Sequence, residues 1–139
     1  MKLFIDASVA LAAAGQRTGA SRAVFDGAQS AGWELLCSRY VLGEIATNLR
    51  RLPPGAAQDW PALAVQLTLV RDLTSFDYPV IFPASKDRPV LFTAAGWADV
   101  LVTLDRRHFG PLFRPGFYSL RVSPPGDFLW QERAAGRLR

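Results

Sequence analysis

Short apolar runs alternate with helical segments along most of this chain, and this alternation limits its fold more than any other feature. Strand-like runs are expected at residues 2–5 (KLFI), 33–37 (WELLC), 100–104 (VLVTL) and 118–122 (YSLRV). Helices are expected at about 9–14, 21–32, 39–51, 59–73, 87–95 and 126–135. Strands separated by helices of this length predict an α/β fold, in which a largely parallel sheet carries helices on both faces.

Local signals support several of these boundaries. Gly32 is placed to end the second helix, and Ser38 is placed to cap the next one. Pro53 and Pro54 then end that helix. The run at residues 78–82 (YPVIF) fits either a short edge strand or extended coil, and the sequence leaves both open.

Length and composition fit one cytoplasmic domain over residues 1–139. There is no linker, repeat or low-complexity stretch that would divide the chain. Half of the residues are apolar, but the apolar runs are shorter than the ~20 residues that a membrane span needs. The N-terminus also lacks the features of a signal peptide. We therefore expect a protein with no membrane association.

The few metal-binding and cationic side chains narrow the chemistry further. One cysteine, Cys37, and one histidine cannot supply the ligands of a zinc site. The formal net charge is +4, and Lys2 and Lys86 are the only lysines. Nearly all positive charge is therefore guanidinium, the group best shaped for bidentate phosphate contacts. This composition permits an anionic partner but does not show one.

Two of the expected strands end in an aspartate. Asp6 closes KLFID and Asp105 closes VLVTLD. In an open parallel sheet the functional crevice lies at the carboxyl ends of the strands, so the two carboxylates share one rim if their strands are neighbours. Glu44 lies at the edge of its helix's apolar stripe, and Asp87 stands at a helix start that can face the strand ends. These positions predict an acidic pocket.

Each of these carboxylates also has a simpler structural explanation. Asp6 can merely end a strand, Asp105 can start a turn, and Asp87 can cap the helix that follows it. Glu44 can be an exposed side chain. The combination of all four favours a functional site. Asp99 is excluded from it, because it begins the strand that Asp105 ends and so lies roughly 20 Å away.

Four segments of the chain carry a family resemblance: FIDAS, SRYVLGEIATNL, KDRPVLFTAAGWADVLVTLDRRHF and YSLRVSPPGDFL. In this order they resemble PIN-domain proteins, named for the PilT N-terminus, and among them the VapC-like toxin ribonucleases of type II toxin–antitoxin pairs. The most specific part is a Leu-Val-Thr-x-Asp strand that follows a helix opened by Asp. For residues 1–139 the resemblance implies a three-layer αβα sandwich with a five-stranded parallel sheet in the order 3-2-1-4-5.

The same resemblance implies an activity and its residues. It implies a Mg²⁺- or Mn²⁺-dependent endoribonuclease that forms homodimers and is inhibited by an antitoxin whose tail enters the acidic groove. The family's catalytic and metal-binding quartet maps to Asp6, Glu44, Asp87 and Asp105, and its supporting hydroxyls map to Ser8 and Thr103. The chain departs from the family at Pro89 and Phe92, in a helix that more often holds small residues.

Physical chemistry agrees with a metal at such a cluster. Two carboxylates ~5 Å apart at an effective dielectric of about 20 repel by roughly 3 kcal/mol, so four would raise their own pKa values or recruit a cation. Oxygen ligands without Cys or His favour Mg²⁺ or Mn²⁺, which would supply an activated water and neutralise charge on a phosphate. No organic cofactor is expected, and the sequence does not choose between one metal and two.

Arginines near this rim are candidates to hold the RNA backbone, although each could equally be a solvated surface residue. They are Arg106, Arg107, Arg114, Arg50 and Arg51. His108 could protonate a leaving oxygen, but a lone loop histidine more often has no catalytic part. The tryptophans fall on different elements, so we expect them to pack in the core or an interface rather than form a base-stacking row.

Other functions stay open at this point. A PIN-type RNA-processing or DNA-directed nuclease would lack the antitoxin, and an inactive PIN fold would act as a binding module. A signalling receiver domain also clusters aspartates at strand ends, but it needs two adjacent acids after its first strand and a lysine late in the sheet. FIDAS has one acid, and neither Lys2 nor Lys86 is placed for that role.

Overall fold

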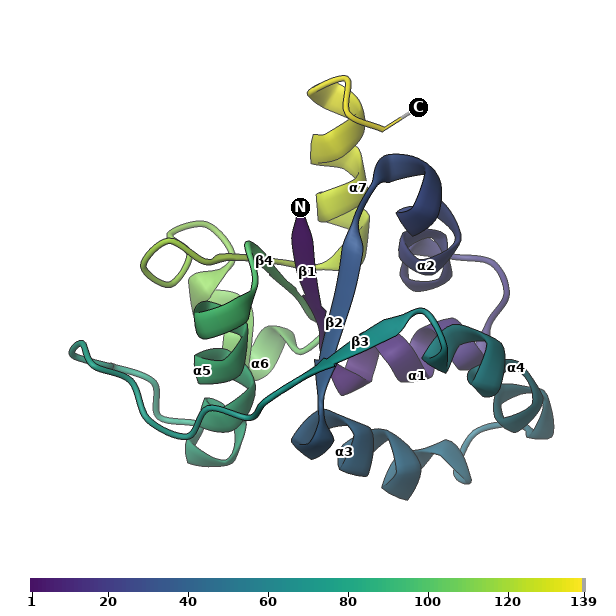
Figure 1. Cartoon of the computed structure of the whole chain (residues 1–139), viewed down its shortest axis with the longest axis horizontal. Helices are drawn as coiled ribbons and strands as arrows, with labels where there is room; N and C mark the ends of the chain where they lie inside the picture. The colour runs from purple at the N-terminus through teal and green to yellow at the C-terminus, as the bar shows by residue number, and fades with distance from the viewer. Residues whose placement is uncertain (139) are drawn as a thin grey trace.

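The apolar runs form a five-stranded parallel sheet in the computed structural model, which describes residues 1–138 (Figure 1). The strands are β1 (Lys2–Ile5), β2 (Glu34–Ser38), β3 (Leu67–Val70), β4 (Val100–Val102) and β5 (Arg121–Ser123). Their order is β3-β2-β1-β4-β5, and each neighbouring pair is parallel. The expected α/β fold and strand order are confirmed.

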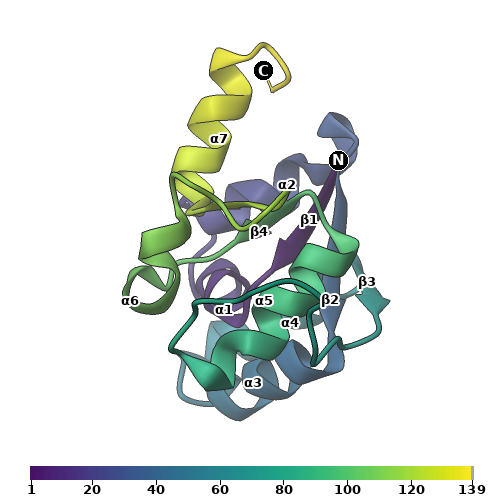
Figure 2. The same cartoon turned by 90° about the vertical axis from the view of Figure 1, so that its left-hand side faces the viewer.

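Helices cover both faces of this sheet. They are α1 (Ala7–Gly15), α2 (Ala20–Ala31), α3 (Arg39–Leu49), α4 (Pro54–Ala64), α5 (Arg88–Trp97), α6 (Arg106–Phe109) and α7 (Pro125–Ala134). Two short 3-10 turns, η1 (Ser85–Asp87) and η2 (Gly110–Leu112), precede α5 and follow α6. Figures 1 and 2 show α5 on one side of the central strands and α1 with α2 on the other.

The centre of the sheet is the centre of the core. Every residue of β4 and residues 3–5 of β1 are buried, as expected for middle strands that helices cover on both faces. The carboxyl ends of β1 and β4 are therefore held rigidly by the core, and the residues that follow each strand are positioned by it. Within residues 1–138, no helix has the length and apolar character needed to cross a membrane.

The helix expected over residues 59–73 is wrong in its second half. The helix α4 ends at Ala64, and residues 67–70 form the edge strand β3, in which Leu67 lies opposite Leu35. Thr68 and Val70 are β-branched and so suited to a strand. Pairing with β2 also satisfies backbone groups that the sheet edge would otherwise leave open. Tertiary pairing therefore overrides the helical pattern.

Smaller differences occur at other strand ends. The last strand spans residues 121–123 rather than 118–122, because a tight turn with Tyr118 at φ +55° precedes it and pairs Phe117 with Leu120. The strand β4 ends at Val102, two residues earlier than expected. The run at 78–82 forms no strand and lies in the long connection from β3 to η1.

Candidate metal centre at the carboxyl ends of the strands

Asp6 sits where β1 passes into α1, and its carboxylate is held by three donors. The backbone N–H of Ala7 donates to Oδ1 at 2.9 Å, and the hydroxyls of Ser8 and Thr103 donate to Oδ2 at 2.8 and 2.7 Å. The side chain is only 7% exposed. Burial raises the pKa of Asp6 above its usual value. The three hydrogen bonds lower the pKa less strongly, and the charge of Asp87 adds a smaller rise.

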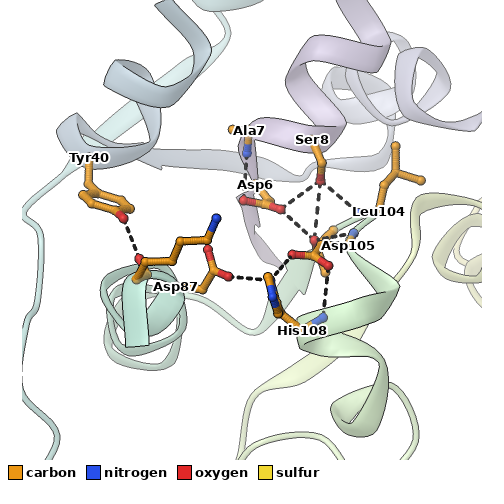
Figure 3. Close-up of polar contacts among 10 residues, drawn as sticks. Asp6, Ala7, Ser8, Tyr40, Asp87, Leu104, Asp105 and His108 are labelled. Atoms are coloured by element: carbon orange, nitrogen blue, oxygen red, sulfur yellow. Dashed lines mark hydrogen bonds and ion pairs between the residues drawn. The ribbon is translucent and has the colours of Figure 1, made fainter. Parts of the chain in front are cut away.

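The same two hydroxyls connect Asp6 to the end of β4. Thr103 Oγ1 accepts the backbone N–H of Asp105 at 3.1 Å, and Ser8 Oγ accepts that of Leu104 at 3.0 Å (Figure 3). The chain leaving β4 is therefore bound to the chain leaving β1. This network fixes where Asp105 stands relative to Asp6.

His108 lies between Asp105 and Asp87. Its Nδ1 is 2.9 Å from Asp105 Oδ2 and 2.8 Å from Asp87 Oδ2, and only the first contact has hydrogen-bond geometry. Asp105 also caps α6, because its Oδ1 accepts the backbone N–H of His108 at 3.0 Å. Ligand atoms of these three side chains all lie within 4.8 Å of one another.

Asp87 stands at the start of α5 but makes no side-chain capping bond there, so capping does not explain it. It is 7% exposed, and its Oδ2 has no hydrogen-bond partner within residues 1–138. Burial raises the pKa of Asp87, and Asp105 adds to the rise, while His108 and Lys86 oppose it. The carboxylate faces His108 in Figure 3.

Glu44 projects from α3 and is half-buried. Burial, and less strongly the negative charges of Asp6 and Asp87, raise the pKa of Glu44 to about 7. The positive charge of Lys86 has a smaller, opposing effect. Its Oε1 is buried without a hydrogen-bond partner in the described chain. We call Asp6, Glu44, Asp87 and Asp105 the acidic rim. Its members come from four separate segments of the sequence.

Of the residues expected to support the site, the two hydroxyl residues contact Asp6, whereas the arginines are exposed on the surface. Ser8 and Thr103 both contact Asp6, as described above. Arg106 and Arg107 are exposed on α6 directly after Asp105, whereas Arg50 and Arg51 are exposed beyond the end of α3. Arg50 lies six positions after Glu44, about 9 Å along the helix axis. Asp99 accepts the backbone N–H of Lys2 at the opposite end of the sheet.

Sequence reasoning gave His108 little weight and did not include Tyr40. A local signal for His108 was available, because an aspartate at an N-cap accepts the backbone N–H of the residue three positions later, which here is His108. The Tyr40 hydroxyl donates to the carbonyl of Lys86 (Figure 3), which holds the start of α3 against η1. No local sequence pattern predicts this contact between Tyr40 and Lys86, which are 46 residues apart.

The acidic rim offers the carboxylate oxygens that suit a hard divalent cation, and Glu44 Oε1 and Asp87 Oδ2 are buried and lack a hydrogen-bond partner within residues 1–138. In the same residues the structure brings Asp87, Asp105 and His108 within ligand distance of one another, whereas Asp6 and Glu44 lie outside that group. Three of the four carboxylates have raised pKa values, so the cluster resists carrying its full negative charge alone. A cation would remove that conflict.

Comparison with solved structures shows a similarity of fold. The fold of this chain is similar to that of a solved structure of VapBC2 from Rickettsia felis bound to a DNA fragment from its promoter. The TM-score is 0.62 and the identity 13%, over 89% of this chain and 98% of that one. No protein-family model and no curated protein sequence matches the chain. The likeness is one of fold.

Proposed function

We propose that this protein, as a single PIN-like domain, is a metal-dependent endoribonuclease and the toxin of a type II toxin–antitoxin pair. The observation that carries the proposal is the acidic rim. Buried carboxylates with raised pKa values are costly to keep, and such groups gather at functional sites far more than elsewhere. A fold shared with a VapBC2 structure supports the same interpretation.

Asp6, Glu44, Asp87 and Asp105 would hold Mg²⁺ or Mn²⁺. When bound, the ion supplies a more acidic water and neutralises negative charge that builds on a phosphate. Asp6 is already oriented for this role, because Ser8 and Thr103 occupy the lone pairs of Oδ2 while Oδ1 accepts only the N–H of Ala7. Ser8 and Thr103 would therefore act by positioning Asp6.

Proton transfer can use Glu44 or His108. Glu44 Oε1 has no competing hydrogen bond within residues 1–138, so this carboxylate is free to take a proton from an attacking water. His108 is held by Asp105 at Nδ1, which leaves Nε2 to exchange a proton with a leaving oxygen. Arg106 and Arg107 would contact the RNA backbone beside the rim.

The proposed inhibitor is an antitoxin that brings positive charge to the acidic rim. Rim oxygens without hydrogen-bond partners can accept a guanidinium or ammonium group, so a basic antitoxin side chain would compete with the metal. The solved VapBC2 structure is itself a complex of this kind of pair. We further propose that the active form is a homodimer, which sedimentation of the purified protein tests.

The deciding experiment is cleavage of a mixed single-stranded RNA pool in Mn²⁺, in Mg²⁺ and in EDTA. We expect cleavage only with metal. Asp6→Asn and Asp105→Asn should each reduce the rate at least ~100-fold, since even residues that only orient metal ligands cost 10–100-fold. Asp99→Asn, at the other end of the sheet, is the matched control and should cleave like wild type.

Each other outcome points elsewhere. Cleavage of DNA but not RNA would favour the DNA-directed nuclease, and RNA cleavage without inhibition by any co-encoded protein would favour RNA processing. Equal cleavage by wild type and the rim variants, or no metal-dependent cleavage at all, would overturn the nuclease and leave the binding module.

A further inference from the structure

A cavity of about 750 Å³ lies between α6, η2 and α7, and its lining begins at Arg106, the residue after Asp105. Its floor includes Ser123 at the end of β5, and Figure 2 shows α7 rising beside α6. The side chains that matter for its chemistry are Arg106, Phe113, Arg114, Asp127 and Trp130. We call this cavity the α6–α7 groove. None of the rim carboxylates lines it.

Trp130 presents an indole ring to this groove. It is 70% exposed, whereas its neighbours Phe128 and Leu129 on α7 are buried and attach the helix to the core. The indole therefore contributes little to the packing of this chain's core, which was one of the two roles expected for the tryptophans. A large exposed aromatic face on the wall of a cavity is suited to stacking on another flat ring.

The groove also carries unneutralised positive charge. Arg106 and Arg114 are both exposed, and neither lies within 4.0 Å of a carboxylate oxygen in residues 1–138. The Arg106 guanidinium instead lies over the ring of Phe113, 5.8 Å from its centroid, which orients it. Asp127 offsets one of the two charges, so the groove keeps a net positive charge.

The residue that follows Asp105 of the acidic rim, Arg106, lines this groove. Arg106 follows Asp105 in the chain, so their Cα atoms are ~3.8 Å apart. A strand with one phosphate at the rim would pass Arg106 and then reach Trp130. Alternating cationic and aromatic contacts along one path are the pattern that holds single-stranded nucleic acid without reading its sequence.

We propose that the α6–α7 groove binds the single-stranded RNA that continues from the cleavage site, with Trp130 stacking on a base and Arg106 and Arg114 contacting phosphates. This inference rests on the proposed function for its choice of RNA. It adds a substrate-binding residue, Trp130, and a direction in which the strand leaves the rim.

Binding can be tested without catalysis. Fluorescence anisotropy in EDTA would follow a labelled single-stranded RNA of about 12 nucleotides, a length within the usual range of such sites. Trp130→Ala should weaken binding about tenfold without changing its salt dependence, and Trp130→Phe should restore most of the affinity. The Arg106→Ala, Arg114→Ala double variant should lower the salt slope by about 1.4, roughly 0.7 for each phosphate that the protein no longer neutralises. The corresponding double lysine variant should keep that slope.

The outcomes separate this inference from the proposed function. The expected signatures together with failed cleavage would support the groove and refute the nuclease. Metal-dependent cleavage with unchanged binding in both the Trp130→Ala and the double arginine variants would refute the groove alone. If Trp130→Ala instead changes the sedimentation of the protein and leaves RNA affinity intact, the groove is a protein interface and the inference is wrong.

Discussion

Glu132 and the acidic rim both bury carboxylates, and the surroundings shift the pKa values of the two sites in opposite directions. Glu132 on α7 is 0% exposed, and it accepts hydrogen bonds from Arg137 Nε at 2.7 Å and from Arg121. Arg137 lowers the pKa of Glu132 below its usual value, against the opposing effect of burial. At the acidic rim, burial instead raises the pKa values of Asp6, Glu44 and Asp87.

The difference teaches that burial of a carboxylate does not by itself indicate function. Glu132 has cationic partners within its own chain, and so it serves as an internal tie between α7 and β5. The acidic rim has no guanidinium within 4.0 Å of its carboxylates in residues 1–138, only the shared His108, and two of its buried oxygens lack a hydrogen-bond partner there. A buried acid that lacks a permanent counter-ion is the one that can take a ligand.

Metal addition should separate the two sites most strongly. At a Mn²⁺ concentration of 100 times its Kd, the free energy of unfolding of wild type should rise by about 2.7 kcal/mol, because the ion binds only the folded rim. Urea unfolding in Mn²⁺ and in EDTA measures this. The Asp87→Asn, Asp105→Asn double variant should lose the increase and Glu132→Gln should keep it. An equal increase in all three proteins would place the metal elsewhere.

Removal of the Glu132 charge should destabilise the protein with or without metal. Glu132→Gln leaves Arg121 and Arg137 without their anion, and hydrogen bonds to charged groups are each worth about 1.5–3 kcal/mol, so we expect a loss of about 2 kcal/mol. Urea unfolding of the variant measures it. Asp26→Asn is the matched control, because it breaks an exposed pair with Arg22 and should cost less. A stable Glu132→Gln protein would mean that the ion pair is dispensable.

The two sites should also depend on pH in opposite senses. The folded pKa of Glu44 is about 7 against 4.5 unfolded, so as pH rises through this range the unfolded state releases its proton first and stability falls. Glu44 is only half-buried, which limits the fall to roughly 1 to 2 kcal/mol. Glu132 has a lowered pKa, so its contribution is present above pH 4.5 and is lost as pH falls below it.

Unfolding in EDTA between pH 4.5 and 8 tests the Glu44 prediction. Glu44→Gln should flatten part of the wild-type decline, and Glu132→Gln should leave the slope over this range unchanged. If Glu44→Gln keeps the full decline, Glu44 is not among the groups that burial makes hard to ionise.

Much of this arrangement could be predicted because it depends on short-range patterns. The positions of Asp6 directly after β1 and of Asp105 three residues after β4 follow from the apolar runs before them, and the half-burial of Glu44 follows from its place on an amphipathic helix. The strand β3 could not be predicted, because its sequence suits either a helix or a strand and its partner strand lies 32 residues earlier, where Leu35 pairs with Leu67.

The burial of individual side chains on a helix could not be predicted where it depends on which face of the helix the rest of the chain covers. On α7, Glu132 is buried and Trp130 is exposed, which is the reverse of what their polarity suggests. The cause is tertiary: Arg121 from β5 and Arg137 from the C-terminal turn surround Glu132. A sequence pattern read one helix at a time cannot contain that information.

Substitution of His108 should change the free energy of unfolding least, yet it tests the comparison most sharply. His108 is the basic partner of the acidic rim, as Arg121 and Arg137 are the basic partners of Glu132. One imidazole shared by Asp87 and Asp105 is a weaker partner than two guanidinium groups on one carboxylate. His108→Ala should therefore cost only about 1 kcal/mol in EDTA, the net worth of an ordinary hydrogen bond. With saturating Mn²⁺ the cost should shrink, since a cation at the rim replaces what the imidazole did. Urea unfolding under both conditions, with His108→Gln as the variant that keeps a donor, measures the change. A cost that grows in Mn²⁺ would instead make His108 a metal ligand, and an unchanged cost would reduce it to packing.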